Sequence, residues 1–442
     1  MPAAMPSEAR AAAYAVLRRT FEQGAFTDRA FAAAARPLSA RDRALAMHLA
    51  YGAVQRALTL DHLIEQASGR AASAIDPPLL AALRLGCYEL CFAGSAPHAA
   101  VHDAVELSKA ARHGHSLVNA VLRRLARERD DLLGALTDED PAAASIRHSM
   151  PRWIVDQWWD ALGPQTARAL LARSNEPAES ALRANTLRTD AATLAASLPV
   201  ATALPGDPPE AVITLEPFDA HGSQQWREGR LMPQSRASML VAHAVAPLPG
   251  ERVLDLCAAP GGKSTHLAAL MGGRGEIVSV ERHAGRARAL QRTAMRMGAE
   301  NVTVEIADAT RPRPRGERFA RVLVDAPCTG LGTLQAHPDL RWRMTPDTLA
   351  TLAEQQARLL SAAAVACAPG ATLVYSTCTV SPAENERQIG AFLDAHPQFA
   401  AVDLQSRFPA WAHPAAPDQL LALGPVQGSD GFFIAALVRR GG

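Results

Sequence analysis

The chain has 442 residues, of which 48% are hydrophobic and 20% are charged, and its formal net charge is +1. This length predicts two or three domains, and this composition is typical of a globular protein with an ordinary buried core. The small net charge excludes any argument for nucleic-acid binding from overall charge. Such binding would have to depend on local basic patches.

The cysteine pattern argues against a zinc protein, and the lack of long apolar runs argues against a secreted or membrane-spanning protein. The six cysteines include no Cys-x-x-Cys pair, and no cluster of histidine and cysteine has the spacing of a zinc site, so we expect no metal. The N-terminus lacks an apolar core of signal-peptide length, and no run reaches the roughly 20 apolar residues of a membrane span. We therefore expect a cytoplasmic protein with free thiols, no membrane partner and, by default, a monomeric state.

Residues 8–130 are expected to form a helical domain. Apolar residues recur at helical spacing, and breakers such as Gly69 and the turn at residues 76–78 separate the segments. The last segment carries four arginines, for which charge alone favours a solvated helix face. The expected helices cover residues 12–21, 44–57, 78–91, 101–111 and 117–125.

A boundary is expected at residues 130–150, which are acidic and contain Pro141 and a run of small residues. Residues 145–245 then form a middle segment. It begins with a helix-like PRWIVDQWWDALG and continues with SALRANTLR, a strand-and-turn pattern with basic ends. Periodicity alone does not assign its fold.

From residue 246 to residue 440 strands and helices alternate, which predicts a largely parallel sheet with helices on both faces. Ligands of such sheets bind at the carboxyl ends of the strands. The residues at those ends are Cys257, Glu281, Asp308, Asp325–Cys328 and Cys378. The expected strands cover residues 252–259, 276–281, 301–308, 320–327, 371–378 and 432–440, and the expected helices residues 263–271, 284–298, 349–367 and 384–395.

A glycine turn between the first of these strands and its helix offers free backbone N–H groups to a polar or anionic ligand. Its residues are Cys257, Ala258, Ala259, Pro260, Gly261, Gly262 and Lys263. A P-loop for nucleotide hydrolysis is the alternative, because Gly262-Lys263-Ser264 fits the end of that motif. The first glycine of the motif would fall at Cys257, so the match fails.

Acids follow the next two strands. Glu281 is placed to accept both hydroxyls of a ribose, and Asp308 could accept from an adenine amino group. Either carboxylate alone is more typical of a loop cap. Together with the glycine turn they indicate a pocket for a nucleoside.

Two cysteines stand at the ends of the fourth and fifth strands, which are normally neighbours in this architecture. Cys328 in Asp325-Ala-Pro-Cys and Cys378 in Ser376-Thr-Cys should therefore face one another. Cysteines on helical faces are interpreted as packing residues. The following triplet Arg341-Trp342-Arg343 fits two explanations equally, RNA binding or a loop that packs its tryptophan.

The motifs CAAPGGK, DAPCTG and STCT, in this order, resemble those of the RNA cytosine-C5 methyltransferases. The segments RDRALAMHLAYGAVQR, LLAALRLGCYELCF and VNAVLRR resemble the NusB family of RNA-binding helical domains. The pairing is similar to the bacterial Sun/Fmu (RsmB-type) family, which acts on 16S ribosomal RNA. The resemblance covers nearly the whole chain.

This resemblance implies three domains: an all-α NusB-like domain at residues 8–130, a small α+β RNA-binding subdomain at 145–245, and a Rossmann-like methyltransferase domain at 246–440. It implies S-adenosylmethionine as cofactor, held by Cys257–Lys263, Glu281, Asp308 and Asp325. It implies Cys378 as nucleophile and Cys328 in release of the covalent adduct, with small-subunit rRNA or its assembly intermediate as partner. The chain departs from the family at Gln234-Ser235, where a Gln-Asp pair is usual, and residues 205–230 match poorly.

The expected chemistry needs a thiolate. Cytosine C5 is too weak a nucleophile to take a methyl group until a thiolate adds to C6, which is covalent catalysis. Lys263 could favour that thiolate, and Asp325 could bond to the base and stabilise developing charge. Two alternatives stay open, methylation of another RNA such as tRNA and a non-catalytic RNA-binding or assembly factor. DNA cytosine-C5 methyltransferases place the nucleophile in a Pro-Cys motif, which would be Cys328.

Overall fold

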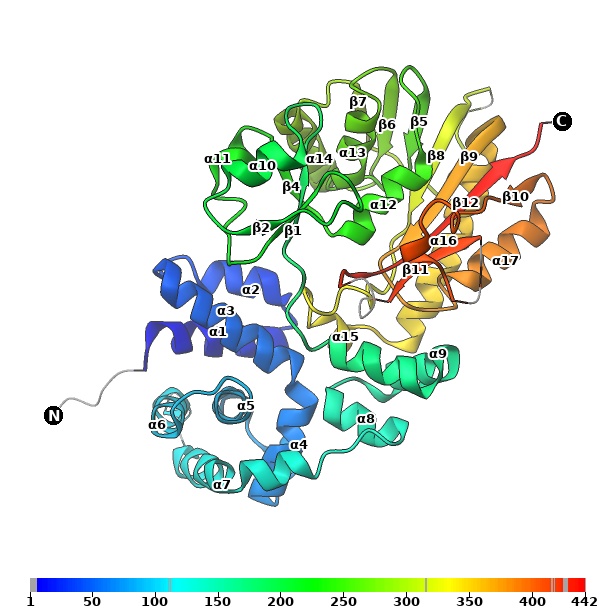
Figure 1. Cartoon of the computed structure of the whole chain (residues 1–442). Helices are drawn as coiled ribbons and strands as arrows, with labels where there is room; N and C mark the ends of the chain where they lie inside the picture. Colours follow the sequence, from blue (N-terminus) through cyan, green and yellow to red (C-terminus); the bar gives the residue numbers. More distant parts are fainter. Residues whose placement is uncertain are drawn as a thin grey trace. The chain divides into compact units, whose positions relative to one another are not determined.

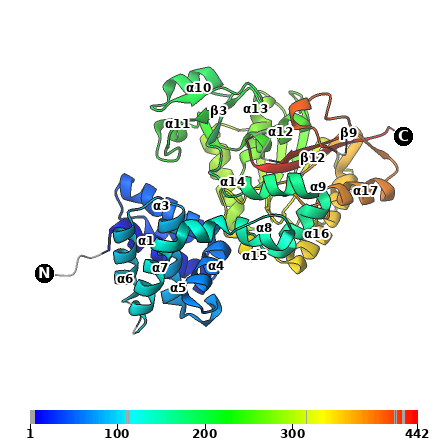
Figure 2. The ribbon, with the colours of Figure 1, turned by 60° about the horizontal axis from the view of Figure 1, so that its bottom comes forward.

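The computed structural model describes residues 6–109, 111, 113–314, 316–414, 416, 418–423 and 428–441. The chain forms two compact units, and Figures 1 and 2 show the elements of each. Among the described residues, no helix combines the length and apolar character needed to cross a lipid bilayer. The first unit comprises Met1–Glu176 and Leu334–Arg343, and the second comprises Pro177–Thr333 and Met344–Gly442.

The first unit is helical, as the apolar periodicity predicted. Helices cover most of all five predicted segments. The segment predicted at residues 44–57 is divided at Arg56 between two helices. The segment predicted at residues 101–111 ends at Ser108, and residue 110 lies outside the described residues. The helices are α1 Glu8–Glu22, α2 Thr27–Ala34, α3 Ala40–Gln55, α4 Ala57–Ser68, α5 Pro77–Cys91, α6 Pro97–Ser108, α7 His115–Gly134, α8 Pro141–His148, α9 Arg152–Arg173 and α15 Leu340–Arg343.

Close packing and capping explain two local features of this unit. Helix α3 approaches α5 at Gly52, where a Cβ atom would lie 2.0 Å from the ring of Tyr88. Helix α8 lies inside the stretch that the composition predicted as a boundary. It begins there because the Asp140 carboxylate accepts hydrogen bonds from the N–H groups of Ala142 and Ala143, and Pro141 suits the first turn.

The second unit contains two sheets. The smaller is antiparallel, with the order β2-β3-β1-β4, and its apolar side chains pack against α10 around Leu182, Leu194 and Val212. This arrangement is the α+β segment that the sequence resemblance implied. Its elements are β1 Ala181–Ala184, α10 Ala191–Ser197, β2 Thr202–Ala203, β3 Ala211–Thr214, α11 Gln224–Arg227 and β4 Leu231–Pro233.

The larger sheet has the order β10-β12-β9-β8-β5-β6-β7, with β11 paired to β12. The pairs from β9 to β7 are parallel, whereas β12 is antiparallel to both β9 and β10. The predicted parallel core is therefore present, with an antiparallel edge. The strands are β5 Arg252–Asp255, β6 Glu276–Val280, β7 Val302–Glu305, β8 Phe319–Asp325, β9 Cys367–Thr377, β10 Phe399–Ala401, β11 Gln419–Leu423 and β12 Gly431–Arg439.

Helices cover both faces of this sheet (Figure 1). Strands β8 and β9 contact both α12 and α16, so the central strands lie between two helical layers. Helix α13 packs beside α12 and α14, and α17 packs beside α16. The expected Rossmann-like arrangement is confirmed. These helices are α12 Arg236–Val245, α13 Gly262–Leu270, α14 Ala284–Met297, α16 Pro346–Ala366 and α17 Glu386–Ala395.

Candidate active site

The carboxyl edge of the parallel strands brings the predicted site residues together. Strand β5 leads into Cys257, β6 into Glu281, and β8 ends at Asp325. Strand β9 ends at Thr377, directly before Cys378. Because β5 lies beside β6 and β8, and β8 lies beside β9, these side chains line one edge of the sheet.

The turn after β5 requires its glycines. Gly261 has a φ of 103°, which side chains other than glycine rarely adopt, and a Cβ atom there would lie 2.5 Å from Leu290. Gly262 then begins α13, whose first N–H groups have no partner within the helix. Below the turn, Asp255 accepts a hydrogen bond of 2.7 Å from Ser264 Oγ.

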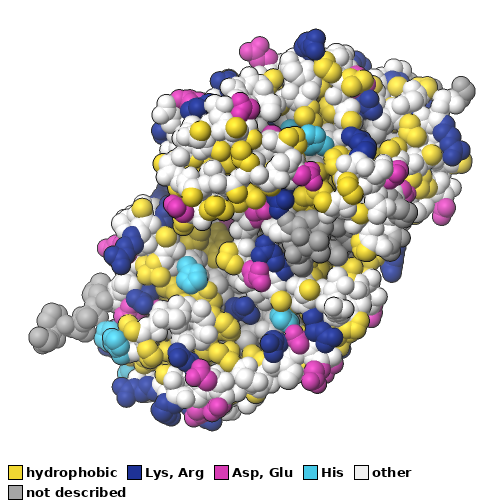
Figure 3. All heavy atoms as spheres, in the orientation of Figure 1, with side chains coloured by type: hydrophobic (Ala, Val, Ile, Leu, Met, Phe, Trp, Pro, Cys, Tyr) yellow, Lys and Arg dark blue, Asp and Glu magenta, His cyan; other side chains and the backbone are white. Residues whose placement is uncertain are grey.

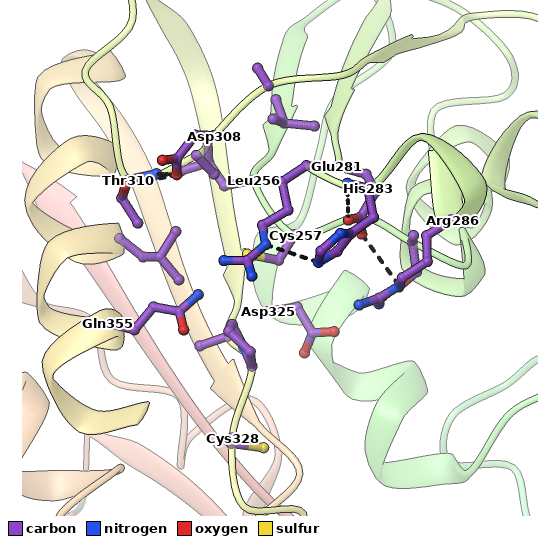
Figure 4. Close-up of a pocket in the computed structure, with 18 of the residues that line it drawn as sticks. Leu256, Cys257, Glu281, His283, Arg286, Asp308, Thr310, Asp325, Cys328 and Gln355 are labelled. Atoms are coloured by element: carbon purple, nitrogen blue, oxygen red, sulfur yellow. Dashed lines mark hydrogen bonds and ion pairs between the residues drawn. The ribbon is translucent and has the colours of Figure 1, made fainter. Parts of the chain in front are cut away.

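A cavity of about 390 Å³ lies beside this turn (Figure 4). Glu281 and Asp308 border it from different sides, and Gln355 enters it from α16. Both acids also cap their own loops. Glu281 accepts from the His283 N–H at 2.8 Å, and Asp308 accepts from the N–H and hydroxyl of Thr310 at 3.0 and 2.7 Å. Their second oxygens make only longer ion-pair contacts, Glu281 Oε2 with Arg286 at 3.5 Å and Asp308 Oδ2 with Arg311 at 3.8 Å. Capping is therefore compatible with ligand binding.

The two cysteines face one another as predicted. Cys328 Sγ and Cys378 Sγ are 3.4 Å apart. Beside them, Lys263 Nζ donates to Asp325 Oδ2 at 2.7 Å, and Ser376 Oγ donates to Asp325 Oδ1 at 2.8 Å. The sequence predicted Cys378, Cys328, Lys263 and Asp325 at this edge, and the structure brings all four side chains together.

A second cavity of about 310 Å³ meets the first at Asp325 and Cys378, which line both. Lys263 and Asp430 border the second cavity, together with Gln234 and Ser235. The two cavities differ in lining, because Glu281 and Asp308 border only the first and Lys263 borders only the second. Two molecules could therefore meet at Cys378.

Comparison with known proteins decides the family. The sequence matches the NusB family over residues 7–127, an RsmF/B-like ferredoxin-like domain over residues 150–213, and the family of 16S rRNA methyltransferase RsmB/F over residues 242–438. It is 36% identical to the probable ribosomal RNA small subunit methyltransferase B of Synechocystis sp., over 97% of this chain and 99% of that relative. The chain belongs to the RsmB/F family.

Two further likenesses extend over most of the chain. The ribosomal RNA small subunit methyltransferase B of Thermus thermophilus is 37% identical over 91% of this chain and 90% of the relative. The crystal structure of PH0851 has a TM-score of 0.79 at 26% identity and covers 98% of this chain and 99% of that one. The family resemblance and the three-part fold class expected from the sequence are thus confirmed.

The cysteines of this RsmB/F site differ in the electrostatic effects on their thiol pKa values. Burial raises the pKa of Cys257, which favours its neutral thiol. The hydrogen bond to Cys378 and burial, together with the charges of Cys378 and Glu384, raise the pKa of Cys328 well above its ordinary value. The site therefore favours the protonated form of Cys328.

Lys263 keeps its charge although only 13% of its side chain is exposed to solvent. Burial lowers its pKa, but the charge and the hydrogen bond of Asp325 outweigh burial, and the charge of Cys378 acts in the same direction. The net effect raises the pKa of Lys263. A permanent cation at this position stabilises negative charge in the second cavity.

Sequence reasoning missed the residues that hold the Cys328 loop. Glu384 is buried and accepts from the Thr329 N–H at 2.9 Å and also from the Thr329 hydroxyl. Gln356 donates to Glu384 at 3.1 Å and to the Pro327 carbonyl at 2.9 Å. Glu384 and Gln356 thus fix the backbone on both sides of Cys328. Their positions in the sequence gave no local signal, because Glu384 lies 55 residues from Thr329.

The triplet Arg341-Trp342-Arg343 lies in the helical unit rather than at this site. Arg341 is fully buried and donates to backbone carbonyls there, and Trp342 Nε1 donates to the Val54 carbonyl at 2.7 Å. Arg343 is paired with Asp339 at 2.7 Å. For Arg341 and Trp342, packing is therefore the correct explanation of the two that the sequence left open.

Proposed function

We propose that this RsmB/F member transfers a methyl group from S-adenosylmethionine to C5 of a cytosine in small-subunit rRNA, through a covalent bond between Cys378 and C6. The observation that carries the proposal is the meeting of the two cysteines with the Lys263–Asp325 pair where two cavities join. The names of the relatives, which specify small-subunit ribosomal RNA, support the substrate class.

The first cavity fits S-adenosylmethionine. The free N–H groups at the start of α13 suit its polar groups, Glu281 suits the ribose hydroxyls, and Asp308 suits the adenine amine. When bound, S-adenosylmethionine supplies an electrophilic methyl group. Cys378 lines both cavities, so a methyl donor bound in the first would lie beside the second.

The second cavity suits the target base. Cys378 Sγ adds to C6, and the electron pair of the C5–C6 double bond moves to C5, which takes the methyl group. Asp325 accepts a hydrogen bond from the exocyclic amine, while Lys263 stabilises the charge that develops on the ring. A base within a helix must first be extracted, or the target must be single-stranded.

Release needs removal of the C5 proton and cleavage of the bond between C6 and Cys378. Cys328 can serve as the base only after its own proton passes to water, a step that loss of its hydrogen bond to Cys378 favours and that its burial and the charge of Glu384 oppose. The Cys328 thiolate can then take the C5 proton as the double bond re-forms and Cys378 leaves. A water molecule in the same place is the alternative base.

Three variants test this proposal. Methyl transfer from labelled S-adenosylmethionine into small-subunit rRNA from cells lacking the protein should occur at one cytosine, located by base-resolution mapping. Cys378→Ala should abolish transfer, and Cys328→Ala should accumulate a covalent RNA–protein adduct because release fails. Cys91→Ala, in the helical unit, is the matched control and should behave like wild type.

The opposite pattern would change the assignment. Retained activity in Cys378→Ala with loss of all adduct in Cys328→Ala would make Cys328 the nucleophile. Transfer into tRNA but not into rRNA or subunit particles would change the substrate. A protein that binds rRNA and transfers no methyl group would fit the non-catalytic alternative.

A further inference from the structure

A second cluster of titratable side chains lies in the same unit, away from the two cysteines. It consists of Glu210, directly before β3, His243 on α12, and His266 on α13. One ligand atom of each lies within 4.8 Å of the others. Glu210 and His266 are buried, and the His243 side chain is 21% exposed.

Both imidazole rings direct the same nitrogen at one carboxylate. His243 Nε2 lies 2.9 Å from Glu210 Oε1 and 3.1 Å from Oε2, and His266 Nε2 lies 2.7 Å from Oε1. The two rings are nearly perpendicular, with centroids 5.4 Å apart. The cluster therefore converges on one point from three separate elements.

The hydrogen bonds within the cluster are incomplete. The short contact between His266 and Glu210 lacks hydrogen-bond geometry, and neither ring nitrogen of His266 has a hydrogen-bond partner. A buried imidazole whose nitrogens are unsatisfied is costly. This orphaned ring is the observation that points to a missing partner.

The charge state of the cluster suits a cation. His266 is buried, and a neutral imidazole offers a nitrogen lone pair to a metal ion. A buried carboxylate between imidazoles carries a negative charge that a divalent cation would neutralise.

We propose that Glu210, His243 and His266 bind one divalent transition-metal ion of the Zn²⁺ type. Two neutral imidazoles and one carboxylate are a donor set that this class of ion prefers, and the exposed edge of His243 leaves room for water as a further ligand. Bonds of about 2.0–2.2 Å to the metal require donor atoms roughly 3.3 Å apart, so the three side chains must adjust their positions on binding.

The position of the cluster indicates that a bound ion would stabilise the packing of the small sheet against the larger one. Glu210 belongs to the small sheet, whereas His243 and His266 belong to helices that pack on the large sheet. Helix α13 begins at Gly262 in the glycine turn, one turn before His266. Arg183 of β1 donates to the Gly262 carbonyl at 2.7 Å, which joins the same two parts. The ion would link the small sheet to α13, the helix that begins in the glycine turn.

Cobalt titration tests the site directly. Full-length protein without an affinity tag, dialysed against a chelator, is titrated with Co²⁺ while the visible d–d absorption is followed. We expect saturation at one equivalent, loss of the band on adding Zn²⁺, and a rise in Tm of several degrees with Zn²⁺. Glu210→Gln keeps the shape but removes the charge, and His243→Ala removes a partly exposed ligand. Each should weaken binding by more than about 100-fold, beyond what outer-shell changes cause.

A matched control is available in His413, whose Nε2 lies 2.7 Å from Glu386 Oε1 in a pair with one imidazole and one carboxylate. His413→Ala should leave the cobalt band unchanged. Absence of a saturable band in wild type, or an equal band in Glu210→Gln, would overturn the proposal and leave a purely hydrogen-bonded cluster. Methyl transfer is measured separately, so failure here leaves the proposed function untouched.

Discussion

Asp255, at the end of β5, is a fully buried carboxylate beneath the glycine turn. Ser264 donates to its Oδ2, and its Oδ1 has no hydrogen-bond partner in the structure. Burial raises the pKa of Asp255 to about 7, with the charge of Asp325 acting in the same direction. In the unfolded chain an aspartate titrates near 3.9. The folded protein therefore holds a proton at Asp255 that the unfolded chain loses at lower pH.

This difference predicts how stability depends on pH. As the pH rises from about 4 to about 7, the unfolded chain releases the proton first, so the contribution of Asp255 to the free energy of unfolding is lost over this range. Asp255→Asn removes the effect. Urea unfolding should show that the variant gains roughly 2–3 kcal/mol of stability relative to wild type between pH 5 and pH 8.

Comparing the variant with wild type cancels the titration of the other groups, which both proteins share. A difference in unfolding free energy that is the same at pH 5 and pH 8 would contradict the raised pKa. Asp347→Asn in the first turn of α16, an exposed aspartate, is the control and should show no pH-dependent difference.

At the residue scale, the sequence predicted the side chains at the carboxyl ends of neighbouring strands. It did not predict side chains that come together only when separate elements pack against one another. Cys328 and Cys378 were predictable because neighbouring parallel strands end at one edge. The cluster of Glu210 and the two histidines was not, because its members lie on three elements and Glu210 is 33 residues from His243. Metal-site spacing rules detect ligands on a single turn or hairpin, which this cluster does not use.

At the scale of elements, α15 shows that a segment distant in sequence belongs to the helical unit. Residues Leu334–Arg343 follow the Cys328 loop in sequence but belong to the helical unit. Arg341 Nη1 donates to the carbonyls of Gln55 and Ser149, and Nη2 donates to the carbonyl of Ser174, at 3.0–3.1 Å. One guanidinium thus joins the ends of separate helices.

Removing this guanidinium should destabilise the protein. Arg341→Ala removes this donor from the Gln55 and Ser149 carbonyls, whereas the Ser174 carbonyl keeps a hydrogen bond from Gln55 Nε2. Because each buried carbonyl without a donor costs about 1–3 kcal/mol, we expect a loss of at least about 2 kcal/mol in the free energy of unfolding. Urea or thermal unfolding measures it. Arg358→Ala, at an exposed position of α16, should change stability by less than about 0.5 kcal/mol. Equal stability of the two variants would show that the contacts of Arg341 are dispensable.

Elements with strong periodicity were predictable, and short or context-dependent ones were not. The alternation after residue 246 predicted β5 to β9 and their helices, because buried parallel strands are continuous apolar runs. Helix α8 was missed because its start depends on the Asp140 cap within an acidic stretch. The sequence also showed no sign that β12 lies between β9 and β10, since strand order follows from long-range pairing.

At the scale of the whole molecule, the charge distribution decides how RNA is bound. With a net charge of +1, overall attraction to phosphate is weak. Basic and acidic side chains are interspersed over the face shown in Figure 3. Binding must then depend on individual arginines. Helix α7 carries exposed Arg123, Arg124 and Arg127, and a groove against α6 is bordered by Arg123, Arg127 and Asn119.

The partners of these arginines rank them as candidates for phosphate contacts. Arg124 is paired with Glu128 at 2.8 Å, whereas Arg123 donates to Asn119 and Arg127 to a backbone carbonyl. The double variant Arg123→Ala/Arg127→Ala should therefore weaken binding of small-subunit rRNA. Each lost phosphate contact lowers the slope of log K against log salt by about 0.7 in magnitude on single-stranded RNA, so the slope should fall by about 1.4. Fluorescence anisotropy at several salt concentrations measures it.

The control is a second double variant with the same change in charge, Arg292→Ala/Arg358→Ala, at exposed positions of α14 and α16. If α7 contacts RNA, the slope of log K against log salt for this control should stay close to that of wild type. If the two double variants lower affinity and slope equally, attraction follows the overall charge and α7 has no special part in it. Each double variant removes two positive charges from a nearly neutral protein. A difference between them in RNA affinity or salt slope therefore reports the effect of charge position alone.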